Sequence, residues 1–256
     1  FVVMGIPSCS LPIDGSDCKE DEYEVIGRAS IDIAAGTWMQ DRVSVSIMAT
    51  QQYDAIIFGP SCNPAPTGQG DKTSFYLTFD ELIVIEGEPC DENETDPCDL
   101  DAEIDITNSL IPNADFEDVN CEPNNDAQLS CAQDWVQATE GTSDFFSVIN
   151  YPDRTNETLN SGMFNPPPPN GSDHFVGIWP REYVGSCILG DGLIAQSTYT
   201  LEVDLGAPEI GVSNDAVVDV PIVVYAIPDC SLLPIPGSDC KHDDFEEIGR
   251  VVVTIA

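Results

Sequence analysis

The sequence near the start of this chain is repeated near its end. Residues 5–34 read GIPSCSLPIDGSDCKEDEYEVIGRASIDIA, and residues 226–256 read AIPDCSLLPIPGSDCKHDDFEEIGRVVVTIA. About two thirds of the positions are identical once Leu233 is treated as a one-residue insertion, and the two copies lie about 222 residues apart. Diverged copies at a long period are typical of repeat arrays. Because the second copy ends at Ala256, where the first continues as AGTW, we interpret the chain as slightly more than one period of a longer tandem protein.

Between the two copies the hydrophobic pattern is that of β-strands. Residues 43–47 (VSVSI) and 199–205 (YTLEVDL) alternate apolar and polar side chains, as half-buried strands do. The 19 glycines and 20 prolines lie mainly between such runs, and no amphipathic helix is evident. The sequence therefore predicts an all-β fold, an antiparallel β-sandwich of two packed sheets. Further strands are expected at residues 53–58, 75–85, 175–179 and 217–225.

Ten cysteines point to an oxidising compartment and to a disulfide-stapled chain. Most of them lie in local pairs around loops rich in Pro, Gly or Asp, and the short knuckles of zinc sites are missing. The spacing predicts four disulfides: Cys9–Cys18, Cys90–Cys98, Cys121–Cys131 and Cys230–Cys240. Three N-x-[ST] sequons, at Asn93, Asn156 and Asn170, fit a secreted chain, although such triplets also arise by chance. We expect an extracellular or cell-surface location.

The charge of the chain excludes several kinds of partner. With 46 acidic and 8 basic residues, the formal net charge is −38. Nucleic acids and anionic membrane surfaces are therefore poor partners, whereas divalent cations and high salt suit such a surface. No apolar run of 18 residues is present, so no membrane-spanning helix is expected.

The most acidic segment, residues 86–105 (EGEPCDENETDPCDLDAEID), separates the two halves of the chain. Ten of its twenty residues are acidic, and it has no apolar periodicity, which indicates a linker pinned by a disulfide. A calcium-binding loop is the alternative, because closely spaced carboxylates suit a hard cation, although the EF-hand pattern is missing.

Several motifs on either side of the linker resemble one family. Residues 110–135 (LIPNADFEDVNCEPNNDAQLSCAQDW), 174–188 (HFVGIWPREYVGSCI), 197–208 (STYTLEVDLGAP) and 76–86 (YLTFDELIVIE) are similar to strands of galactose-binding-like jelly-roll domains. Such domains, which resemble carbohydrate-binding modules, occur in tandem-repeat cell-surface and secreted proteins of Bacteroidota. The last motif resembles the strand that closes the domain. The resemblance covers most of the chain as a pattern.

The resemblance and the repeat together imply how the domains are cut. Residues 1–88 would be the C-terminal part of one sandwich, residues 89–105 the acidic linker, and residues 106–256 the N-terminal part of the next sandwich. Each part alone has unpaired strand edges, which are unstable or prone to stick together. We therefore expect a neighbouring segment or subunit to supply the missing strands.

Two further expectations follow from this division. The resemblance implies a structural calcium ion held by Glu117 of the opening strand and Asp80 of the closing strand, each with the counterpart from a neighbouring copy. The two cysteines left after local pairing, Cys62 and Cys187, would bond to each other in the simplest case. The repeat argues instead that each forms a disulfide with the adjacent copy.

No catalytic constellation is recognisable, so we do not expect an enzyme. The chain has only two histidines, and His242 replaces Glu20 of the first copy, which argues against a fixed catalytic role. The sequence predicts a structural repeat of an extracellular filament or surface adhesin, with other copies of itself as partners. A carbohydrate-binding module that binds glycans is the alternative. Its aromatic platform would need an exposed tryptophan. Trp38, Trp135 and Trp179 are each expected in the core rather than in a binding site, with exposure of Trp179, before Pro180, as the alternative.

Overall fold

The computed structural model describes residues 2–5, 24–28, 31–34, 37–39, 42–61, 67–68, 76–87, 106–139, 141–148, 168, 170–207, 218–234 and 246–255. Within these residues the chain is all-β, with three short 3₁₀ turns, at Ile106–Asn108 (η2), Leu129–Cys131 (η3) and Cys230–Leu232 (η5). The strands are β1 (Val2–Gly5), β2 (Glu24–Arg28), β3 (Ile31–Ile33), β4 (Thr37–Trp38), β5 (Val43–Met48), β6 (Ala55–Pro60), β7 (Thr67–Gly68), β8 (Leu77–Glu86), β9 (Trp135–Gln137), β10 (Asp144–Ser147), β11 (His174–Ile178), β12 (Val184–Cys187), β13 (Thr198–Ala207), β14 (Val218–Ile227) and β15 (Glu246–Ile255).

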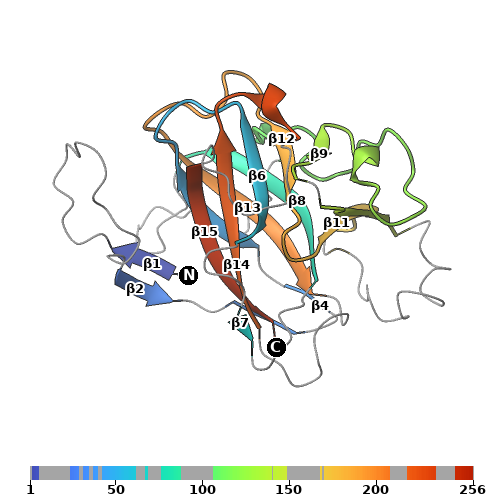
Figure 1. Cartoon of the computed structure of the whole chain (residues 1–256), viewed down its shortest axis with the longest axis horizontal. Helices are drawn as coiled ribbons and strands as arrows, with labels where there is room; N and C mark the ends of the chain where they lie inside the picture. The colour runs from blue at the N-terminus through green and yellow to red at the C-terminus, as the bar shows by residue number, and fades with distance from the viewer. Residues whose placement is uncertain are drawn as a thin grey trace.

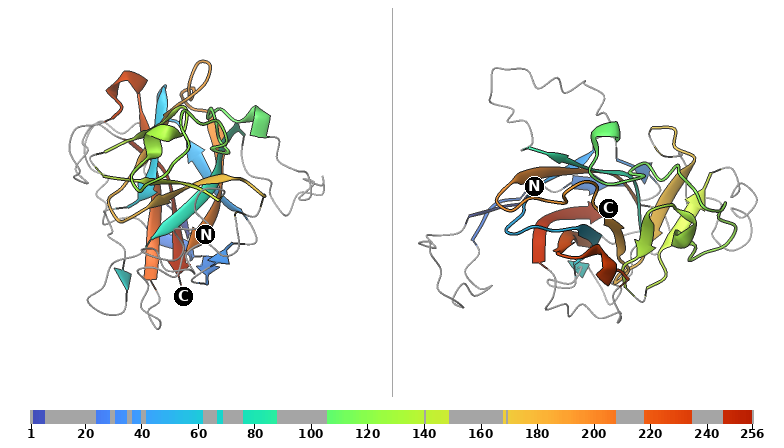
Figure 2. Two further views of the ribbon diagram at one scale, coloured as in Figure 1. Left: turned by 90° about the vertical axis from the view of Figure 1, so that its right-hand side faces the viewer. Right: turned by 90° about the horizontal axis from the view of Figure 1, so that it is seen from above.

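Two sheets pack face to face in a β-sandwich (Figures 1 and 2). One sheet has the order β10-β11-β8-β13-β4, with β5 also paired to β13, and we call it the β8 sheet. The other has the order β3-β15-β14-β6-β12-β9, with β7 paired to β14, and we call it the β6 sheet. Among the described pairs only β3 and β15 run parallel. The predicted antiparallel sandwich is confirmed.

Alternation along the strands produces the core between the sheets. In β5 the side chains of Val43, Val45 and Ile47 are buried, while Ser46 and Met48 between and after them are exposed. Burial of one apolar face of each sheet removes hydrocarbon surface from water, which is the main stabilising contribution in such a fold.

A line of aromatic rings crosses this core. Phe58 on β6 lies 5.1 Å from Phe79 on β8, Phe79 lies 5.7 Å from Phe116, and Phe116 lies 4.7 Å from Trp135 on β9, measured between ring centroids. All four rings are buried. Because Phe58 and Phe79 precede the acidic linker and the other two follow it, the two halves of the chain share one core.

Two strands that precede the linker, β6 and β8, occupy central positions in the two sheets. Strand β6 lies between β14 and β12, and β8 lies between β11 and β13. We expected a neighbouring copy to supply these strands. In the structure, the described parts of residues 37–87 and 106–255 complete one sandwich within a single chain, with β6 and β8 in central positions.

The two copies of the repeated sequence form hairpins with the same pairing. In β1–β2, Val2 pairs with Arg28 and Gly5 with Glu24, with a register shift after Val3. In β14–β15, the counterparts Val223 and Arg250 pair, Ala226 pairs with Glu246, and the register shifts after Val224, the counterpart of Val3. The shared strand pairing and bulge agree with the expectation that both copies adopt the same hairpin. The cysteine loops of both hairpins lie largely outside the described residues.

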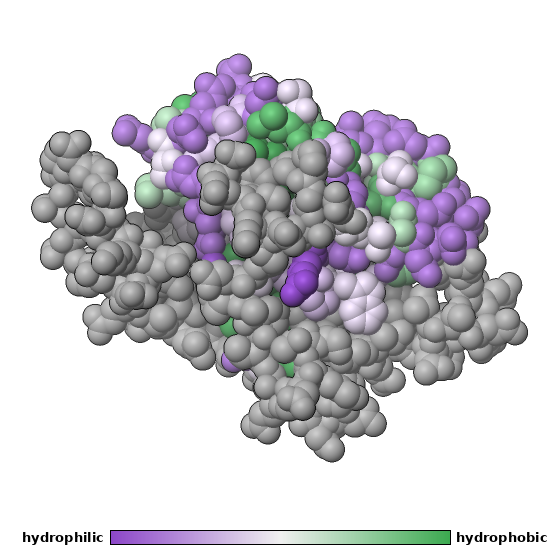
Figure 3. Space-filling view, in the orientation of Figure 1, coloured by the Kyte–Doolittle hydropathy of each residue, from purple (hydrophilic) through white to green (hydrophobic). Residues whose placement is uncertain are grey.

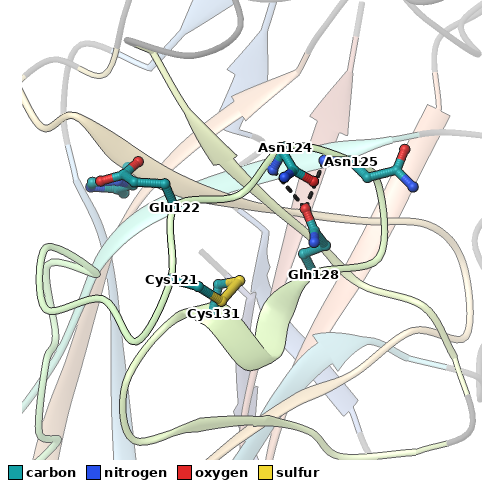
Figure 4. The surroundings of a disulfide bond; sticks show 7 residues. Cys121, Glu122, Asn124, Asn125, Gln128 and Cys131 are labelled. Atoms are coloured by element: carbon teal, nitrogen blue, oxygen red, sulfur yellow. Dashed lines mark hydrogen bonds and ion pairs between the residues drawn. A yellow bond between two sulfur atoms is a disulfide. The ribbon is translucent and has the colours of Figure 1, made fainter.

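Two disulfides are present among the described residues. The Cys121–Cys131 bond is confirmed and closes a loop beside Glu122 and Gln128 (Figure 4). The second joins Cys187 to Cys230. It replaces both the Cys230–Cys240 pairing and the inter-copy bond that we expected for Cys187. The physical reason is that the last residues of β12 and β14, Cys187 and Ile227, both lie opposite Ala55 on the two sides of β6. Cys9, Cys18, Cys62, Cys90, Cys98 and Cys240 lie outside the described residues.

Candidate functional site

A β-bulge in β8 contains two neighbouring carboxylates, Asp80 and Glu81. Asp204 on β13 pairs with Asp80 while Glu202 pairs with Ile83, so β8 has an extra residue at this point. Glu81 has a φ of 46°, in the left-handed region that non-glycine residues rarely adopt. Bulges of this kind redirect side chains and are common next to functional sites.

The Asp80 carboxyl is fully buried and incompletely bonded. Its Oδ1 accepts a hydrogen bond from the Glu81 backbone N–H at 2.9 Å, but Oδ2 has no hydrogen-bond partner among the described residues. Burial raises the pKa of Asp80 well above its usual value, and the nearby carboxylates of Asp204 and Glu117 raise it further. A hydrogen bond with the Ser172 side chain lowers the pKa of Asp80, against these two effects. A carboxyl in this position is stabilised either by a proton or by a bound cation.

Arg42, at the start of β5, supplies the positive charge of this cluster. Its guanidinium forms an ion pair with Glu81, and its Nε lies 3.4 Å from Asp204 Oδ1. Asn170 donates from Nδ2 to the other oxygen of Asp204 at 2.5 Å. Burial raises the pKa of Asp204, while Arg42 and Asn170 lower it. Arg42, Asp204 and the structural role of Asn170 were not predicted from the sequence. The scarcity of basic residues was the one signal that could have singled out Arg42.

Glu117 organises the strand next to this cluster. Its Oε1 accepts hydrogen bonds from the backbone N–H groups of Asp173 at 2.7 Å and His174 at 2.9 Å, and its Oε2 lies 3.0 Å from His174 Nδ1. The other imidazole nitrogen lies 3.3 Å from Glu122 Oε2, and the ring stacks on Phe145. His174 is therefore held between two carboxylates, with its ring buried.

The two residues expected to hold calcium, Asp80 and Glu117, lie in the same sandwich. They are close enough for Glu117 to raise the pKa of Asp80, whereas we expected each to face a neighbouring copy. Asp80 Oδ2 suits a hard cation, but both Glu117 oxygens already serve residues 173 and 174. Among the described residues, no three Asp, Glu, His or Cys side chains form a metal-binding group.

A second cluster, of aromatic side chains, covers the outer face of the β8 sheet. Tyr76, Phe146 and Phe175 are buried there, and Trp38 and Trp179 pack against them half-exposed. Ring centroids are 4.9 Å apart for Tyr76 and Trp179 and 5.7 Å apart for Trp38 and Phe175. We expected all three tryptophans in the core. Only Trp135 lies there, and Trp38 and Trp179 pack in the outer cluster instead. Successive residues of a strand, such as Phe145 and Phe146, point to opposite faces of the sheet, so aromatic side chains occur on both faces.

The carboxylates beside these rings have structural partners. Asp144 accepts hydrogen bonds from the Tyr76 hydroxyl and the Ala127 N–H, both at 2.6 Å. Glu182 accepts from the Thr142 N–H at 3.1 Å and from the Trp179 N–H at 2.8 Å. Since their oxygens are engaged in holding loops, these two acids resemble structural groups more than a glycosidase pair.

Of the three predicted glycosylation sites, only Asn170 lies among the described residues. Asn93 and Asn156 lie outside the described residues. The side-chain nitrogen of Asn170, which would carry a glycan, donates to Asp204. On the face shown in Figure 3, hydrophilic residues make up much of the described surface, and a hydrophobic patch lies among them near the top.

Comparisons with known proteins give no relative for this chain. No protein-family model matches the sequence, and neither curated proteins nor solved structures provide a match. Among the described residues, no helix is long and apolar enough to span a membrane.

Proposed function

We propose that this chain is a non-catalytic structural repeat of an extracellular filament or surface adhesin, assembled from successive copies of the same sandwich. The observation that carries the proposal is the pair of hairpins β1–β2 and β14–β15, which share sequence, strand register and the position of a bulge. One of these hairpins belongs to the sandwich and the other forms a separate two-stranded sheet, as expected of a chain that contains parts of more than one structural unit. The resemblance to tandem-repeat surface proteins of Bacteroidota is consistent with this role.

Two further features support a structural, extracellular role. The disulfides Cys121–Cys131 and Cys187–Cys230 fit an oxidising environment and constrain the unfolded chain. The strongly negative charge keeps polypeptides soluble and disfavours non-specific association, so copies would associate only where strands match.

The proposal is tested by measuring the molar mass of the purified chain in solution. Light scattering should detect head-to-tail oligomers whose mass rises with protein concentration. Negative-stain microscopy of the largest species should show rows of similar globules. A mass equal to that of one chain at every concentration, also after refolding of concentrated samples, would contradict an assembling role.

Binding of a glycan is the second candidate function, and the aromatic cluster on the outer face of the β8 sheet favours it. Trp38 and Trp179 are half-exposed there, and sugars stack on such rings. The test is a glycan array with the parent chain and with Trp179→Ala, using Met48→Ala on β5 as the matched surface control. Specific binding that Trp179→Ala abolishes and Met48→Ala retains would establish this function.

We also propose that a calcium ion stabilises the corner of the sandwich around Asp80. The support is the buried, unbonded Oδ2 of Asp80 among the carboxylates of Asp204, Glu117 and Asp115. Calcium would be structural here, since it takes oxygen ligands in flexible geometry and offsets the repulsion among these acids.

A further inference from the structure

The strands within residues 37–87 make all their described strand pairs with strands that follow the acidic linker. Strand β6 pairs with β12 and β14, and β8 pairs with β11 and β13. Removal of residues 37–87 would split both sheets along their middle. The sandwich formed by residues 106–255 is therefore incomplete without this segment.

No described covalent bond fixes the segment to this particular sandwich. Both described disulfides, Cys121–Cys131 and Cys187–Cys230, lie within residues 106–255. Residues 88–105 connect the segment to the rest of the chain, and described residues before and after this connection are in contact. The Leu110 N–H donates to the Val84 carbonyl at 2.7 Å. The same contacts can form whether the two segments belong to one chain or to two.

The other end of the segment is equally open to exchange. Residues 31–33 of β3, which lead into β4, pair in parallel with Val253–Ile255 of β15. These are the same positions in the two copies of the repeat. The end of β15 therefore lies beside the end of β3, the strand that precedes β4 in the sequence.

We infer that residues 37–87 of one copy of this chain complete the sandwich of a second copy, in the place that they occupy here within their own chain. The inference rests on the proposed function and specifies its contact: the central strands β6 and β8 of one copy inserted into the two sheets of another. Stacking of closed sandwiches through their surfaces is the competing arrangement. Exchange of this segment between chains and closure of the sandwich within one chain make the same described strand pairs. Exchange is therefore favoured only by a high protein concentration or by covalent linkage of successive copies.

A cross-link between opposed strands distinguishes the two arrangements in the full chain. Met48 on β5 lies opposite Thr198 on β13, and both side chains are at least partly exposed. An isotopically heavy chain with Met48→Cys is mixed with a light chain with Thr198→Cys. The mixture is unfolded in denaturant without reductant, so that the native disulfides persist, and is refolded at several concentrations before mild oxidation. Mass spectrometry then quantifies linked peptides that combine one heavy and one light partner.

Two controls define the baseline. A single chain with both substitutions should form the link internally and shows that the opposed positions can bond. Ser44→Cys lies on the same face of β5 but opposite Glu202, so with Thr198→Cys on the other chain it measures random collisions. Four residues along a strand exceed the reach of a disulfide, so the 48–198 link between chains should exceed the 44–198 link at least about tenfold.

Each result decides between named alternatives. Heavy–light 48–198 links that increase with refolding concentration support exchange. Oligomers that form while this link occurs only within the doubly substituted chain overturn exchange and leave an assembly by stacking. The absence of any species larger than one chain overturns exchange together with the proposed function.

Discussion

Ile31 and Val253, which occupy the same position in the two copies of the repeated sequence, lie opposite each other in the parallel pair of β3 and β15. Because the pairing is parallel and in register, the next two residues of each strand also lie beside their counterparts, ending with Ile33 beside Ile255. The two copies are nevertheless in different surroundings. Strand β15 pairs over its length with β14 inside the sandwich, whereas β2 pairs with β1 in a separate two-stranded sheet.

The glycines at the same position of the two copies should respond differently to substitution. A methyl group on Gly249 of β15 would collide with Ile47 Cγ2 on β5, because the two sheets approach closely there. Gly249→Ala should lower the free energy of unfolding by about 1–3 kcal/mol through overpacking. Gly27→Ala in β2 is the matched control and should change it by less than about 0.5 kcal/mol. Equal effects in urea titrations would mean that the N-terminal copy occupies the sandwich just as often.

The shared core predicts that a residue before the linker stabilises the part after it. Phe79 on β8 is fully buried between Phe58 and Phe116. Phe79→Ala should lower the free energy of unfolding by about 3–5 kcal/mol. Met48→Ala, at a position that is 60% exposed, should change it by no more than about 0.5 kcal/mol. A single transition that shifts as a whole is expected, and two separate transitions of which only one shifts would argue for independent halves.

The Cys187–Cys230 disulfide, which the spacing of the cysteines did not predict, can be tested directly. Peptide mapping without reduction should find Cys187 linked to Cys230, and removal of the bond in Cys187→Ser/Cys230→Ser should destabilise the chain by about 2–4 kcal/mol. The matched variant Cys121→Ser/Cys131→Ser removes the shorter loop and should cost less in the chain-entropy account. A map that links Cys230 to Cys240 would restore the local pairing.

The sequence was sufficient for the fold class and for individual strands, because alternation such as that of residues 43–47 directly reflects a sheet with one buried face. It was not sufficient for the pairing of Cys187 with Cys230. That bond depends on β12 and β14 both ending beside Ala55, which is a property of strand order rather than of spacing. The cluster around Arg42 and Asp204 was missed for the same reason, since β5, β8 and β13 meet only in the folded sheet.

Stability should decrease as the pH rises above the ordinary range of carboxyl pKa values, about 4. Burial raises the pKa of Asp80, Asp144, Asp204 and Glu202 above the values that these groups have in the unfolded chain. The folded state therefore binds protons more tightly, and this contribution is present at low pH and is lost as the pH rises through the folded-state pKa values. Thermal melts in chelator at constant ionic strength should show the falling midpoint. The slope should be smaller for Asp144→Asn and unchanged for Asp191→Asn, an exposed control; a midpoint that rises with pH would contradict the prediction.

Calcium should stabilise the folded chain at neutral pH through Asp80. The buried Oδ2 of this residue lacks a partner, and a cation bound there would replace the proton that burial otherwise favours. At a calcium concentration of about 100 times the dissociation constant, binding to the folded state alone adds about 2.7 kcal/mol to the free energy of unfolding. Asp80→Asn should abolish this increase and, in chelator, should melt no lower than the parent, because the amide is neutral like the carboxyl that burial keeps protonated. Magnesium, which demands a stricter geometry, is the control cation and should have the smaller effect. If the parent chain melts at the same temperature in calcium and in chelator, while Asp80→Asn behaves identically, the carboxyl at this bulge is a protonated structural group and not a cation ligand.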